Sequence, residues 1–234
     1  MTDLRQLLTG RPCLLLDFDG PICSVFSGIS SRHAAQELEG TFGAPLPPHL
    51  RATSDPFELL EYAAALSPSV ATAVERKLTQ LEIQAVNCAA PTPDAHNVIR
   101  EAAQRPGGSV AIVSNNSTAA ISAYLTAHNV NEHVSGIFAR RSAETRLKPR
   151  PDLLDAALSD LGVQPDGSTF TGDSVTDLKA AHAAGVPAIG FANKPGKAER
   201  FAQYSPASTI VSMSALLDAL RSLTDAESEQ RPSP

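Results

Sequence analysis

Cys13-Leu14-Leu15-Leu16-Asp17-Phe18-Asp19-Gly20 is the stretch of sequence that decides the fold. Its first four residues form a continuous apolar run, which is typical of a short strand buried on both faces of a parallel sheet. The run ends at two carboxylates, and Gly20-Pro21 then turns the chain. We therefore predict a buried strand that delivers Asp17 and Asp19 to one edge of a sheet.

Similar apolar runs recur along the chain and alternate with helical patterns. The further predicted strands are 109–114, 135–139, 168–173 and 187–191, and the predicted helices are 117–128, 152–161 and 176–184. Strands that alternate with helices of about ten residues indicate βαβ units. The fold class is therefore predicted as α/β, with a Rossmann-like parallel sheet covered by helices on both faces. Ligands of such sheets bind at the carboxyl ends of the strands.

The stretch 24–90 breaks this alternation and is predicted to be entirely helical. Asp55-Pro56-Phe57-Glu58 and Ser67-Pro68 each combine a capping residue with a proline in the first turn of a helix. We predict an all-helical cap at 24–90, inserted after the first strand, and a core domain formed by 1–23 and 91–225. The polar stretch 226–234 contains two prolines and is predicted to be a disordered tail.

Composition and charge exclude several classes of function. The 234-residue chain carries a net charge of −6, which disfavours non-specific nucleic-acid binding. No apolar run approaches the roughly 18 residues that span a bilayer, and the first eleven residues do not resemble a signal peptide. The three cysteines form neither a zinc motif nor a disulfide framework. We expect a cytoplasmic protein with no nucleic-acid or membrane partner, present as a monomer or homodimer.

Four polar clusters follow the predicted strands, and the first is Asp17 with Asp19. At a strand end both carboxylates can approach one ligand, so that one attacks phosphorus and the other transfers a proton. The alternative is an ordinary turn, in which Asp and Gly are common. The second cluster, Ser114-Asn115-Asn116-Ser117, offers a hydroxyl and backbone N–H groups to an anion, although capping of the next helix explains it equally well.

The third and fourth clusters complete a phosphate and metal site. Lys148 offers a compact positive charge to phosphate oxygens, although a surface lysine before a helix is the common alternative. Asp173 ends a strand and Asp177 lies about one helical turn further on, so both can face one point. Such oxygen ligands suit Mg²⁺, whereas the alternative is a capped helix with an acidic first turn. The order of the four clusters, each at a strand end, favours the functional interpretation.

These clusters resemble the four motifs of the haloacid dehalogenase superfamily, over residues 12–195. The insertion resembles the helical cap of its phosphoglycolate-phosphatase-like branch. The resemblance implies that Asp17 is the nucleophile and Asp19 the acid/base, that Ser114, Asn115 and Lys148 bind phosphate, and that Asp17, Asp19, Asp173 and Asp177 form the Mg²⁺ site. One residue departs from the pattern, because the family usually has threonine after the glycine of the first motif, where this chain has Pro21.

The sequence thus predicts a Mg²⁺-dependent phosphatase of a small phosphorylated metabolite that acts through an aspartyl-phosphate. A sugar-phosphate phosphotransferase or mutase shares every motif and stays open. Pro21 leaves open a catalytically inactive binding protein that keeps the fold. A dehalogenase is less consistent, because its chemistry needs neither a metal nor an acid at position 19. The cap sequence does not identify the substrate.

Overall fold

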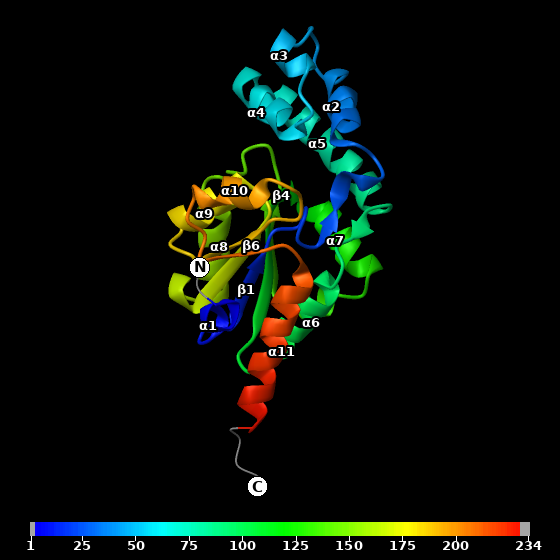
Figure 1. Cartoon of the computed structure of the whole chain (residues 1–234). Coiled ribbons are helices and arrows are strands. Elements are labelled where there is room, and N and C mark those ends of the chain that lie inside the picture. The colour runs from blue at the N-terminus through cyan, green and yellow to red at the C-terminus, as the bar shows by residue number, and fades with distance from the viewer. Residues whose placement is uncertain (1–2, 230–234) are drawn as a thin grey trace.

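The computed structural model describes residues 3–229 and is built around one six-stranded sheet (Figure 1). The strand order is β5-β4-β1-β6-β7-β8, and every pairing is parallel. The strands are β1 (Cys13–Leu16), β4 (Ser109–Ser117), β5 (Gly136–Arg140), β6 (Ser168–Gly172), β7 (Ala188–Phe191) and β8 (Ser208–Ile210). All five predicted strands are present, and the edge strand β8 is an addition that the sequence did not indicate.

The central strand β1 shows why this sequence forms a sheet covered on both sides. Successive side chains of a strand point to opposite faces. Accordingly, Leu14 and Leu16 belong to one hydrophobic cluster, whereas Cys13 and Leu15 belong to another. All four side chains are almost fully buried. The continuous apolar run is therefore what a strand between two layers of helices requires.

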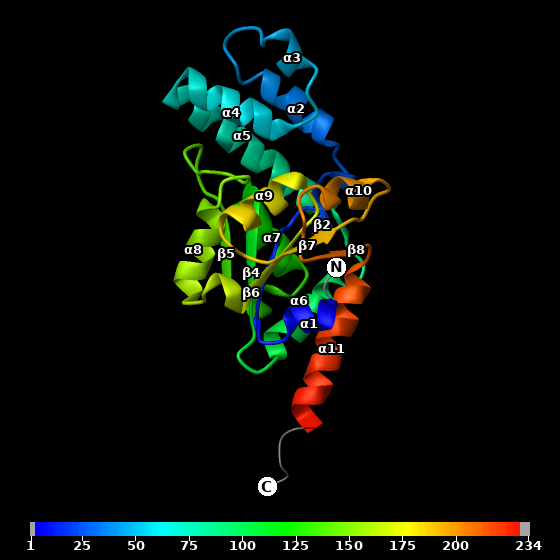
Figure 2. The ribbon, with the colours of Figure 1, turned by 60° about the vertical axis from the view of Figure 1, so that its left-hand side comes forward.

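Helices cover both faces of the sheet, as predicted (Figure 2). The layer that shares a cluster with Leu14 and Leu16 consists of α1 (Leu4–Leu8), α6 (Ala95–Gln104), α7 (Thr118–Ala127) and α11 (Met213–Glu229). The opposite layer consists of α8 (Asp152–Leu161), α9 (Val175–Ala183) and α10 (Lys197–Ala202). Helix α9 ends at Ala183, two residues before Gly185, which has φ +71° and fits the expected helix stop. Short 3₁₀ turns lie at η2 (Asn131–His133) and η3 (Pro165–Gly167).

The insertion between β2 (Cys23–Ser24) and β3 (Ala90–Pro91) is helical and lies beyond the carboxyl edge of the sheet (Figure 1). It contains η1 (Val25–Ser27), α2 (Ser31–Glu39), α3 (Pro48–Arg51), α4 (Pro56–Leu66) and α5 (Pro68–Val86). The predicted caps are present, since Asp55 accepts a hydrogen bond from Phe57 N and Ser67 accepts one from Val70 N. These helices enclose their own apolar cluster, which includes Leu59, Val74 and Leu78.

Helix α5 connects the insertion to the body of the protein. Its residues Val74, Leu78 and Leu81 pack in the cluster of the insertion, whereas Ala85 and Val86 pack in a cluster of the sheet. One continuous helix therefore contributes to both hydrophobic clusters, and its last turns lie close to α7 (Figure 2).

Residues 226–229, the start of the stretch predicted to be a disordered tail, belong to α11, which continues to Glu229. Alanine and glutamate favour helix, and they extend a helix that is anchored by Met213, Leu216 and Leu220 in the core. Residues 230–234, the rest of that predicted tail, lie outside the described residues. Within the described residues, no helix has the length and apolarity needed to cross a membrane.

Candidate active site

Asp17 directly follows β1 and lies at the floor of the site. Its backbone N–H donates to Thr171 O at 2.9 Å, and its Oδ1 accepts from Phe18 N at 2.7 Å. Its side chain is only 10% exposed. Burial, followed by repulsion from Asp177, raises the pKa of Asp17 to about 8, although Lys148 acts in the opposite direction. A carboxylate in this environment favours a bound cation, because a cation stabilises its charged form.

Asp19 lies two residues further on, and the backbone holds its side chain in place. Asp19 Oδ1 accepts from Val25 N at 2.9 Å, at the start of the insertion. Burial raises the pKa of Asp19 to about 6, and the charge of Asp173 adds to this effect. A carboxyl group with such a pKa can donate a proton and take one back near neutral pH, as an acid/base residue must.

The turn after Asp19 requires glycine. Gly20 has φ +104°, and a Cβ at this position would lie 2.4 Å from Cγ of Asp173. Pro21 follows, and the hydroxyl of Thr92 donates to Gly20 O at 2.5 Å. Thr92 follows β3, where the chain returns from the insertion. Thr92 was not among the residues predicted from the sequence. The turn therefore receives a hydroxyl from a distant threonine, although Pro21 itself has none.

Ser114 and Asn115 lie where β4 departs from regular pairing. Ser114 is buried, and its Oγ donates to Asn116 Oδ1 at 3.2 Å. The next helix, α7, begins only at Thr118, and Ser117 caps it by accepting from Ala120 N. The structure therefore places Ser117 at the helix N-terminus, as the capping alternative implies, and keeps Ser114 within the strand. Both Ser114 and Asn115 line the cavity described below.

Lys148 is the buried cation of the site. Its Nζ lies 2.8 Å from Asp17 Oδ1 and 2.6 Å from Asp177 Oδ1, and it donates to Val113 O at 2.9 Å. Burial alone would lower the pKa of Lys148, but the two carboxylates outweigh burial and raise it. The surface-lysine alternative is excluded, because the Lys148 side chain is 3% exposed.

Asn115 holds this lysine through its backbone. Asn115 Oδ1 accepts from Lys148 N at 2.8 Å, and Asn115 Nδ2 donates to Lys148 O at 3.1 Å. Both ends of the amide are therefore engaged with Lys148. Asn115 was predicted to bind phosphate, and in this geometry its side chain positions the lysine.

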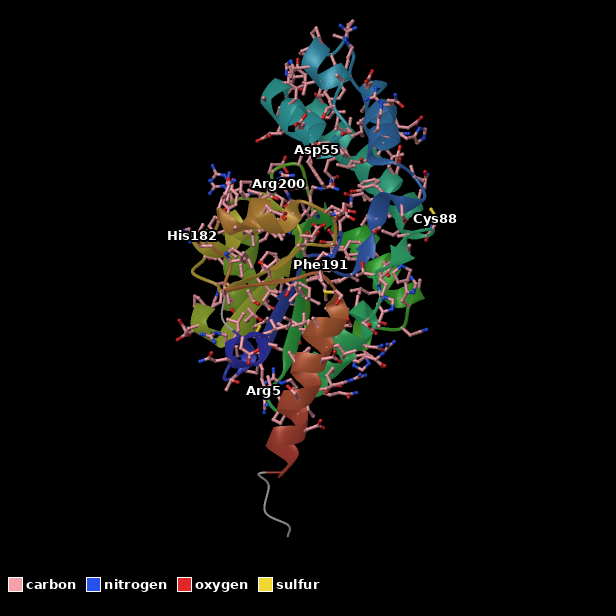
Figure 3. All side chains as sticks on the ribbon, in the orientation of Figure 1. Arg5, Asp55, Cys88, His182, Phe191 and Arg200 are labelled. Atoms are coloured by element: carbon pink, nitrogen blue, oxygen red, sulfur yellow. The ribbon has the colours of Figure 1, made fainter. Side chains whose placement is uncertain are left out.

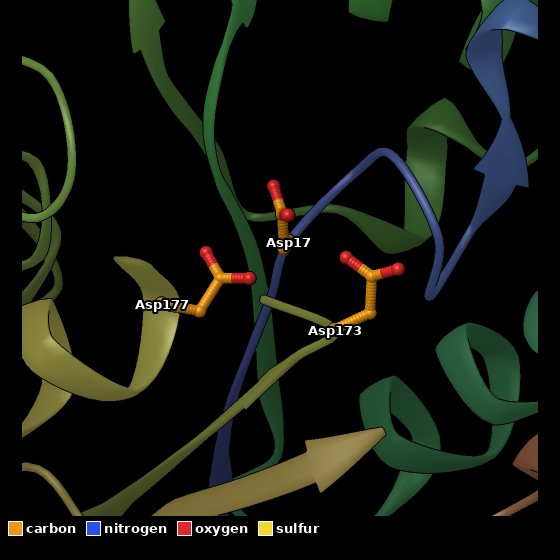
Figure 4. A group of neighbouring side chains, drawn as sticks. All are labelled: Asp17, Asp173 and Asp177. Carbon is orange, nitrogen blue, oxygen red and sulfur yellow. The ribbon is translucent and has the colours of Figure 1, made fainter. Parts of the chain in front are cut away.

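Asp173 and Asp177 lie on either side of Asp17 (Figure 4). One carboxylate oxygen from each of the three residues lies within 4.8 Å of the others. Three hard oxygen donors at this spacing fit Mg²⁺, which takes one or two carboxylates and retains several waters. Asp177 Oδ2 also accepts from Ser174 N at 3.0 Å and completes a capping box at the start of α9. Asp177 thus supports the helix and the candidate metal site together.

Two residues that the sequence analysis missed contact Asp173. Lys197 Nζ lies 2.5 Å from Asp173 Oδ2 and donates to Asp173 O at 2.7 Å, and Asn193 Nδ2 donates to Asp173 Oδ2 at 3.2 Å. Both follow β7, at the same edge of the sheet as the predicted motifs. That position was the signal that could have identified them. Burial raises the pKa of Asp173, and Lys197 lowers it.

A cavity of about 600 Å³ opens above these residues, between the sheet edge and helix α4. Its floor contains Asp17, Asp19, Ser114, Lys148, Asp173 and Asp177. Its other walls come from α4, which includes Glu58 and Glu61, and from the loop 143–150. Asp55, which caps α4, also lines it and lies on the side of the insertion that faces the sheet (Figure 3). The sequence-predicted residues thus share one cavity with side chains of the insertion.

The family of this chain is identified by comparison with models of known protein families. Residues 15–191 match the model of the haloacid dehalogenase-like hydrolase family, and the chain belongs to that family. The match includes all four motifs and the whole helical insertion. The resemblance inferred from Asp17, Ser114, Lys148 and Asp173 is therefore confirmed.

Curated relatives and solved structures agree with this family. The phosphoglycolate phosphatase of Salmonella typhimurium is 31% identical over 114 residues, 49% of this chain and 45% of that protein. The Escherichia coli K12 enzyme of the same name is 31% identical over 90 residues, 38% of this chain and 35% of that protein. The chain thus matches less than half the length of these relatives.

Two solved structures are similar to this one in fold. One is CbbY from Rhodobacter sphaeroides in complex with phosphate (TM-score 0.66, 21% identity, 90% of this chain and 99% of that chain). Another is a subfamily IA haloacid dehalogenase hydrolase from Geobacter sulfurreducens (TM-score 0.60, 20% identity, 90% and 97%).

Proposed function

We propose that this protein is a Mg²⁺-dependent phosphatase that hydrolyses a small phosphorylated molecule through an aspartyl-phosphate on Asp17. The observation that carries the proposal is the surroundings of the Asp17 carboxylate. It lies at the floor of a cavity, 2.8 Å from a buried lysine and close to two further carboxylates that suit a divalent ion. The phosphoglycolate phosphatases that match part of the chain support the same reaction class.

The main obstacle to this reaction is the repulsion between a carboxylate and a phosphate ester, and positive charge in the site would offset it. Mg²⁺, held by Asp17 and Asp173 with Asp177 and the backbone carbonyl of Asp19 beside it, would supply positive charge to the phosphate oxygens. Lys148 contributes a second, permanent cation at the same point. Ser114 offers its hydroxyl to the transferring group from the neighbouring strand end.

Asp17 and Asp19 then have different roles in the reaction, as nucleophile and as acid/base residue. An Asp17 oxygen attacks phosphorus in line, the bond from phosphorus to the ester oxygen breaks, and Asp19 protonates the leaving oxygen. Asp19 next accepts a proton from a water molecule that attacks the same phosphorus. The bond from phosphorus to Asp17 breaks, and inorganic phosphate and a free carboxylate result. The pKa of Asp19, raised to about 6 by burial, suits both proton transfers.

The helical insertion fits the role of a cap that selects the leaving group. We propose the division anticipated from the sequence, with a core of residues 1–23 and 91–225 and a cap of residues 24–90. Helix α4 supplies side chains to the cavity that holds Asp17, so the cap contacts any molecule bound there. A cytoplasmic location and a monomeric or dimeric state stay predictions from the sequence.

Replacement of the nucleophile tests the proposal. Asp17→Asn is expected to abolish Mg²⁺-dependent phosphate release from a panel of phosphate monoesters, because the amide cannot attack phosphorus. Circular dichroism establishes that the variant is folded. A folded Asp17→Asn protein with full activity would exclude Asp17 as the nucleophile.

A further inference from the structure

A buried ion pair joins helix α5 of the cap to strand β5 of the core. Arg140 Nη2 lies 2.5 Å from Glu82 Oε2, and both side chains are 0% exposed. Removing two charges from water costs several kcal/mol per ion, and their attraction offsets this only when good geometry and further hydrogen bonds satisfy the remaining polar atoms. The reaction described above uses neither residue. Their further hydrogen bonds therefore indicate what the pair does.

Those hydrogen bonds go to a bulge beside the phosphate site. Strands β4 and β5 pair Ser114 with Ala139 and then Ser117 with Arg140, so residues 115–116 have no partners in the ladder. Arg140 Nε donates to Asn115 O at 3.2 Å, and Ser117 N donates to Glu82 Oε2 at 2.9 Å. The ion pair thus gives hydrogen-bond partners to a backbone carbonyl within the bulge and to the N–H group directly after it.

The carboxylate of Glu82 also fixes the orientation of the Asn116 side chain, which contacts Ser114. Asn116 Nδ2 donates to Glu82 Oε1 at 3.1 Å, and Asn116 Oδ1 accepts from Ser114 Oγ at 3.2 Å. An ionised carboxylate only accepts hydrogen bonds. Glu82 therefore holds the nitrogen of the Asn116 amide on its own side and directs the amide oxygen toward the Ser114 hydroxyl.

We propose that Glu82 and Arg140 are positioning residues for phosphate binding. They hold the bulge in the shape that places the Ser114 hydroxyl at the cavity floor and turns Asn115 toward the backbone of Lys148. The proposal rests on the function proposed above, since phosphate is the ligand. It adds a dependence of the phosphate site on α5, the helix that connects the cap to the core.

The test replaces the pair by apolar side chains of similar length, in Glu82→Met/Arg140→Met. Such replacements of buried ion pairs commonly preserve stability, so a folded protein is expected. Titration calorimetry with inorganic phosphate in the presence of Mg²⁺ should show phosphate affinity about tenfold weaker or more, the range typical of lost supporting contacts. The double variant should nevertheless have a lower Tm, because Asn115 O and Ser117 N lose their hydrogen-bond partners. The value of kcat/KM on an active ester, measured well below that Tm, should fall by at least the same factor as the phosphate affinity.

Glu75→Gln is the matched control. Glu75 lies on the same helix and contacts the same arginine, with its Oε1 3.2 Å from Arg140 Nη1, but it does not contact the bulge. This variant should keep phosphate affinity within about twofold, because the backbone contacts of Asn115 and Ser117 persist. A folded double variant that binds phosphate as tightly as the unmodified protein would overturn the proposal.

A second variant covers the case in which the double replacement does not fold. Asn116→Ala leaves the ion pair intact but removes the link from Glu82 to Ser114. It is expected to weaken phosphate binding, and unchanged affinity would overturn the positioning role. Failure of the proposed function looks different, because the unmodified protein would then neither bind phosphate nor hydrolyse any ester.

Discussion

At the scale of single residues, the site depends on groups that lie unusually close together. Gly20 has its backbone directly beside the carboxylate of Asp173, and that carboxylate also contacts Lys197 and Asn193. A side chain at position 20 would have to displace Asp173. The glycine therefore serves both the turn and the candidate metal site.

Gly20→Ala is expected to weaken Mg²⁺ binding and to lower stability by more than the roughly 1–2 kcal/mol that a left-handed conformation costs an ordinary residue. Gly10→Ala is the control, because Gly10 also has positive φ, +73°, but a Cβ there would meet nothing within 4 Å. Urea unfolding and magnesium titration measure both effects. Equal losses of stability in the two variants, with unchanged Mg²⁺ affinity, would contradict this role of Gly20.

The raised pKa of Asp17 predicts that Mg²⁺ binding depends on pH. Because burial raises the pKa of Asp17 to about 8, protons compete with Mg²⁺ for this carboxylate near neutral pH, and a bound metal must displace them. Mg²⁺ affinity should therefore rise with pH up to about 8, and binding at pH 7 should release protons. Calorimetry in buffers of different ionisation enthalpy measures this release. Affinity that stays constant between about pH 6 and 8 would disprove the linkage.

At the scale of elements, the strand ends were predictable from the sequence and the residues between elements were not. An apolar run that stops at Asp17 identifies both a buried strand and the edge where it ends, because burial on two faces excludes polar residues. Lys197 has only the weaker signal of following β7 at this edge, and Thr92 has none. They reach the site only because α10 and the return from the cap pack at that edge.

The position of Ser114 shows the same limit. The sequence predicted a strand that ends at Ser114 and a helix from Ser117, but a two-residue bulge prolongs β4 as far as Ser117. That bulge is satisfied by Glu82 and Arg140, which lie far away in the chain. Local sequence contains no information on such distant partners.

Helix α4 leads to a prediction about the leaving group. It brings the carboxylates of Asp55, Glu58 and Glu61 to the cavity wall at helical spacing. These charges should disfavour a leaving alcohol that itself carries a negative charge, such as the carboxylate of glycolate. Changing all three to their amides should raise kcat/KM for 2-phosphoglycolate relative to glycerol 3-phosphate, by on the order of threefold to tenfold. An unchanged ratio would show that these side chains do not face the bound substrate.

At the scale of the whole molecule, a sheet and an inserted cap share one cavity. The sheet edge supplies the charged groups of the proposed reaction, and helix α4 of the insertion supplies a wall of the cavity above them. Helix α5 is common to both parts, since its side chains pack in both sets of hydrophobic clusters. The architecture followed from the alternation of apolar runs and helices, whereas the shape of the cavity depends on how α4 packs above the strand ends.

The central claim is that the phosphoryl group is transferred to Asp17 before it reaches water. The direct measurement is acid quenching during turnover with Mg²⁺ in water enriched in ¹⁸O, the heavy oxygen isotope. Mass spectrometry of the peptide that contains Asp17 should show a phosphoryl group, and the heavy oxygen should appear in the released phosphate. Turnover without phosphate on Asp17, or with heavy oxygen incorporated into the Asp17 carboxylate, would contradict the account.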